Sequence, residues 1–190
     1  MDITLLKGTT LTPFLLTPPY PNKSLCRLPQ SILSHGVEIF NDKILILGGR
    51  SSFSANRSLD SVFVYDVNKN ELKQMPSLPH AVTEMATVRW GDKVVVIGGS
   101  DKDGKVLSGV LMYDFKTGES NVLPSMSHKR CGCSAIITGN VIVVMGGWNE
   151  KDKHLSSVEC FTLGGFSWGE LPPMIKPRCW ATAIVMPTTF

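Results

Sequence analysis

The 190-residue chain has no block of like charge, no apolar run long enough to span a bilayer and no helical stripe. Its 19 basic and 16 acidic residues are scattered, so nucleic acid is not favoured as a partner. Bilayer crossing needs about 20 apolar residues, so no membrane association is predicted. Asp2 stands where a secretory signal has basic residues, and Pro13 interrupts the weak apolar stretch. These absences predict a cytoplasmic protein.

The five cysteines are odd in number and follow neither a zinc pattern nor a C-x-x-C motif. Cys131 and Cys133 fall on one face of a predicted strand, which allows a redox pair. The favoured interpretation is small packing residues in a reducing compartment. No metal site and no cofactor are predicted.

A glycine doublet ends an apolar run three times. ILIL precedes Gly48-Gly49, VVVI precedes Gly98-Gly99, and VIVVM precedes Gly146-Gly147, at intervals of 50 and 48 residues. A fixed period of this size is typical of a supersecondary unit that stacks on copies of itself.

Other landmarks share this register. An aromatic residue follows the first glycine of each doublet by 17, 15 and 15 residues, and a proline-containing segment closes each unit. The aromatic residues are Tyr65, Tyr113 and Phe161, and the closing segments are 75–79, 123–126 and 171–174. Arg130 and Arg178 repeat at 48 residues, with Val82 in the same place one unit earlier. Independent landmarks therefore agree on one period.

The third unit predicts four short strands. Residues 131–138 form the first, and Gly139-Asn140 supply a tight turn. Residues 141–145 are apolar throughout, so we expect both faces of this strand to be covered. After a polar loop at 148–154, alternation over 157–163 and the segment 166–171 predict the last two strands.

Four-stranded units of about 50 residues, arranged radially, are typical of β-propeller blades. From Ser31 onward, ILILGG, VVVIGG and VIVVMGG with their downstream Tyr-Asp or Phe resemble the kelch repeat. The kelch family also has a tryptophan beyond the tyrosine, which only the third unit keeps, as Trp168. Large rings stabilise contacts between small sheets, so we interpret Tyr65, Tyr113, Phe161 and Trp168 as packing between blades.

We predict an all-β, kelch-type β-propeller that is incomplete, with three full four-stranded blades and the first strand of a fourth. The predicted repeats cover residues 31–79, 80–126 and 127–174, with a partial repeat at 175–190. Residues 1–30 form an N-terminal segment that could supply one strand to a preceding or closing blade. Kelch propellers usually close with about six blades, so we expect a piece of a longer protein. The alternative is a four-bladed ring closed by the N-terminal residues, against which the prolines at 13, 18, 19 and 21 argue.

Catalysis finds little support in the sequence. His80 and His128 are repeat equivalents, and a unique catalytic base seldom occupies a repeated position. Neither the histidine and tyrosine set of a copper-oxidase propeller nor the arginine cluster of a sialidase-like one can be assembled. We predict that the chain is not an enzyme.

The resemblance to kelch proteins implies a partner-binding rim. In such proteins, residues after the glycine doublet and at the start of the next inner strand commonly contact the partner. The corresponding residues are Arg50, Ser52, Ser100, Trp148, Asn149, Glu84, Gly132 and Trp180. Arg50 and Trp148 are favoured, because Arg and Trp are enriched at binding hot spots. For Arg130 and Arg178 repetition favours a structural, blade-to-blade hydrogen bond.

Kelch-like proteins that this chain resembles typically carry a BTB domain ahead of the propeller and present substrates to a cullin-3 ubiquitin ligase. The resemblance therefore implies substrate recognition by a ligase adaptor, with cullin-3 contacted only through a BTB domain that these residues lack. The alternative is a kelch protein that binds actin or acts as a scaffold. The partner itself cannot be inferred, because rim loops vary on a common frame.

Overall fold

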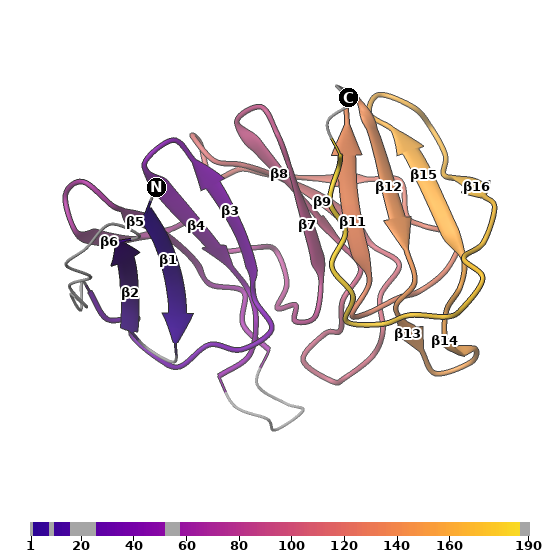
Figure 1. Ribbon diagram of the computed structural model, residues 1–190, viewed down its shortest axis with the longest axis horizontal. Helices are drawn as coiled ribbons and strands as arrows, with labels where there is room; N and C mark the ends of the chain where they lie inside the picture. The colour runs from indigo at the N-terminus through magenta and orange to yellow at the C-terminus, as the bar shows by residue number, and fades with distance from the viewer. Residues whose placement is uncertain (1, 8–9, 16–25, 52–57, 187–190) are drawn as a thin grey trace.

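Three antiparallel four-stranded sheets, one for each glycine doublet, form the body of the protein (Figure 1). The computed structural model describes residues 2–7, 10–15, 26–51 and 58–186. Each sheet is a meander in which sequential strands pair. Blade 1 contains β3 (Gly36–Phe40), β4 (Lys43–Leu47), β5 (Val62–Asp66) and β6 (Glu71–Met75). Blade 2 contains β7 (Ala86–Trp90), β8 (Lys93–Ile97), β9 (Val110–Asp114) and β10 (Ser120–Leu123). Blade 3 contains β11 (Ser134–Thr138), β12 (Val141–Met145), β15 (Val158–Thr162) and β16 (Gly169–Leu171).

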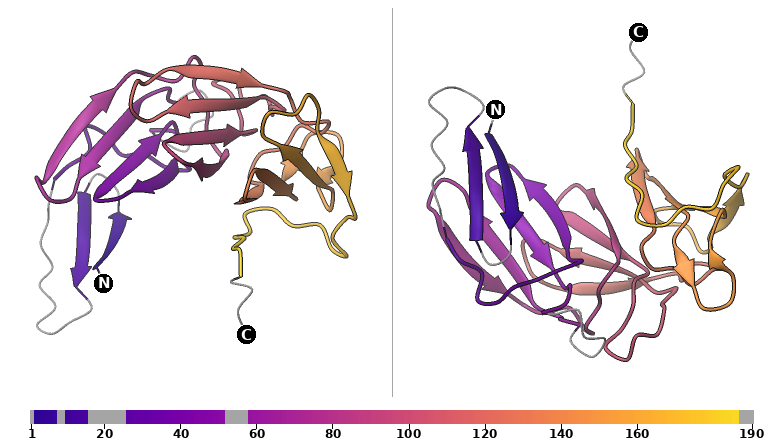
Figure 2. Two further views of the ribbon diagram at one scale, coloured as in Figure 1. Left: turned by 90° about the horizontal axis from the view of Figure 1, so that it is seen from above. Right: turned by 60° about the horizontal axis from the view of Figure 1, so that its bottom comes forward.

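The three blades fan out along an arc (Figure 2), and their first strands β3, β7 and β11 are neighbours on its inner side. This arrangement confirms the prediction of radially arranged, four-stranded propeller blades. The described part of the chain contains no helix long and apolar enough to cross a membrane.

Apolar side chains fill the space between blades. One buried cluster joins blades 1 and 2 and includes Tyr113, and a second joins blades 2 and 3 and includes Phe161 and Trp168. Tyr65 packs on the other face of blade 1 with Leu28 and residues of β4. The predicted packing between blades is confirmed for Tyr113, Phe161 and Trp168, while Tyr65 is buried against the segment that precedes blade 1.

The glycine doublets allow neighbouring blades to approach. Gly98 and Gly99 have φ of +61° and +95°, and a Cβ on Gly98 would collide with the carbonyl oxygen of Arg130. The N–H of Gly99 donates to that same oxygen at 2.9 Å. The other two doublets repeat this contact with the carbonyls of Val82 and Arg178. Glycine is therefore required because the backbone of the next linker lies where a side chain would be.

Arg130 connects blades 2 and 3, as predicted. Its backbone N–H donates to Leu107 of blade 2, while its guanidinium donates to Gly146 O at 2.7 Å and to Glu159 Oε2 at 2.6 Å in blade 3. The side chains of Arg130 and Glu159 are fully buried. Arg178 has the same backbone bonds to blade 3, but its side chain is exposed.

Some strand predictions were wrong in detail. β11 begins at Ser134 rather than at residue 131, because Gly132 with φ of +57° turns the chain before the strand. The predicted polar loop after the third doublet contains a short hairpin of β13 (Trp148–Asn149) and β14 (Lys153–His154). β12 is not covered on both faces: its residues alternate between buried and half-buried, because only blade 2 lies against it within the described residues. In β4 and β8, by contrast, the last four residues are all buried.

The two ends of the chain also differ from expectation. Residues 179–186 were expected to form the first strand of a fourth blade, but they run beside β11 without forming a strand. Two hydrogen bonds hold this segment: Trp180 N donates to Gly132 O, and Ser134 Oγ donates to Ala181 O. The N-terminal prolines argued against central strands, and the structure has a hairpin of β1 (Asp2–Lys7) and β2 (Thr10–Leu15). Pro13 is accommodated because both strands of a two-stranded sheet are edge strands.

Candidate partner-binding cavity

A repeated pair of backbone hydrogen bonds brings the two predicted sets of rim residues together. The residue after each doublet exchanges N–H to O=C bonds with a residue just ahead of an inner strand, at 2.8 to 3.0 Å. The bonded pairs are Arg50 with Leu33, Ser100 with Thr83, and Trp148 with Cys131. Side chains from the two predicted places therefore meet at one end of the blades.

The residue directly after Leu33, Thr83, Cys131 and Cys179 adopts a left-handed backbone conformation in each repeat. Ser34, Glu84, Gly132 and Trp180 have φ between +52° and +60°. The N–H of each of the last three donates to the carbonyl of the one before, at 2.8 to 3.0 Å, which links the blades around the inner end of the arc. Non-glycine residues rarely adopt this conformation, and they occur at ligand clamps and functional sites. Glu84 and Trp180 are therefore held at the rim by the backbone frame.

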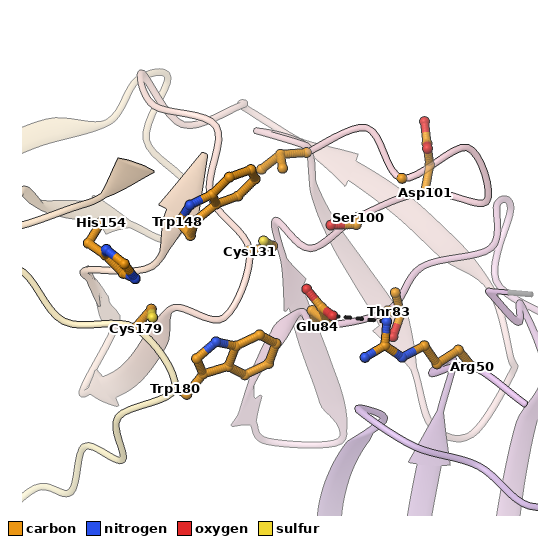
Figure 3. A pocket seen from close by; sticks show the side chains of 12 residues that line it. Arg50, Thr83, Glu84, Ser100, Asp101, Cys131, Trp148, His154, Cys179 and Trp180 are labelled. Carbon is orange, nitrogen blue, oxygen red and sulfur yellow. Dashed lines mark ion pairs between the residues drawn. The ribbon is translucent and has the colours of Figure 1, made fainter. Parts of the chain in front are cut away.

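These residues enclose an open cavity of about 390 Å³ (Figure 3). Its lining comes from all three blades and from the segment after blade 3: Arg50, Thr83, Glu84, Ser100, Asp101, Gly104, Val106, Cys131, Trp148, His154, Cys179 and Trp180. Figure 3 shows the indole rings of Trp148 and Trp180 on either side of Cys131, with Glu84 on the side of Arg50.

The structure brings together five of the eight predicted contact residues: Arg50, Glu84, Ser100, Trp148 and Trp180. Gly132 lies directly behind Trp180, since a Cβ added there would be 3.1 Å from the indole ring. Asn149 lies outside this cavity; its buried amide donates to Lys129 O and accepts from Asp152 N, which fixes the β13–β14 turn. Ser52 lies outside the described residues.

Charge within the cavity is concentrated on one side. Arg50 Nη1 lies 3.3 Å from Glu84 Oε1, and both side chains are largely buried. Burial raises the pKa of the Cys131 thiol to about 12, and the Glu84 carboxylate adds to this effect. Cys131 is therefore a neutral wall residue at physiological pH. The described cysteines are all free thiols, and those of Cys131 and Cys133 are buried.

Sequence reasoning missed several lining residues. Thr83, Cys131 and Cys179 occupy one repeat position, so the 48-residue register pointed to them. Asp101, Gly104, Val106 and His154 come from loops of unequal length, for which the repeat gives no register. Within the described ranges, no three His, Cys, Asp or Glu side chains are grouped so as to hold a metal ion.

Comparison with known proteins decides the family. The KLHDC2/KLHL20/DRC7 Kelch-repeats domain matches residues 23–189. The chain belongs to the kelch-repeat family. No curated protein matches the sequence. Among solved structures, "Structure of YjhT" is similar to this kelch chain with a TM-score of 0.77 at 13% identity, over 90% of this chain and 61% of the YjhT chain. The kelch chain therefore spans less than two thirds of YjhT, and the likeness concerns the fold.

Proposed function

We propose that this kelch chain is the partner-binding part of a protein-interaction propeller and recognises substrates for a cullin-3 ubiquitin ligase adaptor. The observation that carries the proposal is the convergence of Arg50, Glu84, Ser100, Trp148 and Trp180 on one cavity. These residues come from different repeats, and their assembly depends on the blade arrangement. The cavity offers two tryptophans and an arginine, the residue types that dominate binding energy at protein interfaces.

The binding role is tested by capture of partners with the full-length protein. Changing Arg50 and Trp148 together to alanine is expected to abolish capture of a specific partner while the thermal unfolding midpoint stays close to that of the wild type. A matched control is Arg27→Ala with Phe166→Ala, because these are an exposed arginine and an exposed aromatic residue outside the cavity. Capture that survives the first double change, or that the control abolishes equally, would overturn the proposal.

The ligase role is tested separately by association with cullin-3. The full-length protein is expected to bind cullin-3 through a BTB domain, and this binding is expected to persist in the Arg50 and Trp148 variant. Cosedimentation with actin filaments without cullin-3 binding would favour the scaffolding alternative instead.

A further inference from the structure

We infer that the cavity accepts a cationic side chain, an arginine or a lysine, from the bound partner. This inference rests on the proposed function, because it names the chemistry recognised at the same cavity. Three features support it: an excess of carboxylate in the lining, two indole rings, and a cation already placed over one of these rings.

The charged groups favour a cation over an anion. The described lining contains two carboxylates, on Glu84 and Asp101, against the single guanidinium of Arg50. Arg50 and Glu84 are paired at 3.3 Å and offset each other, so Asp101 leaves the lining with an excess of one carboxylate. The Glu84 side chain is only 14% exposed, so its interactions are screened less than those of a surface charge.

The aromatic rings supply a second attraction. Trp148 lies in blade 3 and Trp180 in the segment that follows it, and both line the cavity. The ring face of an indole attracts cations through its quadrupole, and tryptophan does so best among the aromatic residues. Lys153 Nζ lies 5.7 Å from the ring centroid of Trp148, so this indole already interacts with a cation of the chain itself.

The backbone of Trp180 is a third indication. Its φ of +57° is unfavourable for a large side chain, so backbone preference does not explain a tryptophan at this position. The equivalent residue of blade 3 is Gly132, which shows that the frame accepts glycine there. An indole and carboxylates lining one cavity fit the stem and head of a long cationic side chain.

The test uses short peptides as probes and the indole N–H signals of Trp148 and Trp180 in a ¹⁵N-labelled protein. Acetyl-Gly-Arg-Gly-amide and its lysine counterpart are expected to shift both signals with saturation. The neutral citrulline peptide has nearly the same shape, so it is expected to bind about tenfold more weakly. The indole signal of Trp90, at the far end of β7, serves as an internal control and is expected to stay unchanged.

Two variants separate charge from shape. Glu84→Gln and Asp101→Asn are each expected to weaken arginine-peptide binding severalfold. Asp101→Asn keeps an oxygen that can accept the N–H groups of Asp103 and Lys105, so its loop is retained. Phe166→Ala, a change of an exposed aromatic outside the cavity, is expected to have no effect.

Equal binding of the citrulline peptide, or tighter binding of a glutamate peptide, would overturn the inference. Its failure differs from that of the proposed function. If partner capture needs Arg50 and Trp148 but ignores Glu84→Gln and Asp101→Asn, the binding site stands and the cationic ligand is wrong. If capture ignores all four residues, the site itself is wrong.

Discussion

The two blade junctions are filled by different kinds of side chain at the same repeat positions. At the junction of blades 1 and 2, Val82 and Leu111 are both buried in an apolar cluster. At the junction of blades 2 and 3 the same repeat positions hold Arg130 and Glu159, a fully buried ion pair at 2.6 Å. The two junctions differ at both positions of the pair, and a single charge in this place would be buried without a partner.

The hydrogen bonds that proline carbonyls accept across the two junctions also come from different side chains. The Tyr113 hydroxyl donates to Pro76 O at 2.9 Å across the first junction, and Trp168 Nε1 donates to Pro124 O at 2.7 Å across the second. Pro76 and Pro124 are repeat equivalents, but their donors differ in position: Tyr113 lies in β9, whereas Trp168 directly precedes β16. The proline carbonyl acceptor and the backbone path are thus the same at both junctions. The side chains that contact each other across a junction differ from one junction to the other.

The largest expected effect comes from breaking the charged junction on one side only. Arg130→Met leaves Glu159 buried without its cation and is expected to lower the free energy of unfolding by about 3–5 kcal/mol. The double change Arg130→Val with Glu159→Leu copies the first junction and is expected to recover most of this loss. Urea unfolding of the two variants and the wild type measures both effects. A double variant no more stable than the single one would contradict the equivalence of the junctions.

The glycine doublet should be equally indispensable at both junctions. Gly98→Ala places a side chain at a left-handed residue and against the carbonyl of Arg130, so the loss of unfolding free energy should exceed the roughly 1–2 kcal/mol of the backbone strain alone. Gly48→Ala, whose Cβ would lie 2.5 Å from Val82 O, is expected to behave alike. Gly91→Ala is the control, with φ of +58° but open space around it. Equal losses for Gly98 and Gly91 would show that contact between blades is not what requires the doublet.

Removing one interblade hydrogen bond should have a smaller effect. Tyr113→Phe is expected to lower the free energy of unfolding by about 1 kcal/mol, since Pro76 O loses its tyrosine donor. Tyr65→Phe should cost less, because that hydroxyl donates at 3.2 Å to Asn70 within its own blade and bridges no junction. Chemical denaturation of the two variants side by side measures the difference; equal losses would contradict it.

The smallest effect is a difference in acid sensitivity between blades 2 and 3. Hydrogen bonds from Lys93 and from the turn N–H groups lower the pKa of Asp114 from 3.8 to about 2, and Thr162 occupies this position in blade 3. A lowered pKa in the folded state adds stability above pH 3.8 that is lost as the pH falls toward 2. Asp114→Asn should therefore reduce the loss of stability between pH 4 and 2, as followed by thermal unfolding. An unchanged acid profile would show that Asp114 does not contribute.

Periodicity explains what the sequence could predict. Strand content, blade number within the described residues and five cavity residues all follow from one 48-residue register, because each repeat has the same backbone path. The pairing of Arg130 with Glu159 could not be predicted from that register, because the two positions are charged at one junction only. The left-handed conformation at Glu84 and Trp180 was also missed, because neither residue type favours it. Loop residues such as Asp101 could be assigned to the cavity only from the three-dimensional structure.

The most direct test of the account is Trp180→Gly in the full-length protein, measured for both partner capture and the free energy of unfolding. If the backbone frame fixes the rim and the side chains on it serve recognition, capture is lost. Stability is then expected to stay within about 1 kcal/mol of the wild type or to rise, because glycine removes the left-handed strain. Capture at the wild-type level together with a clear loss of stability would contradict the account, since Trp180 would then be a packing residue.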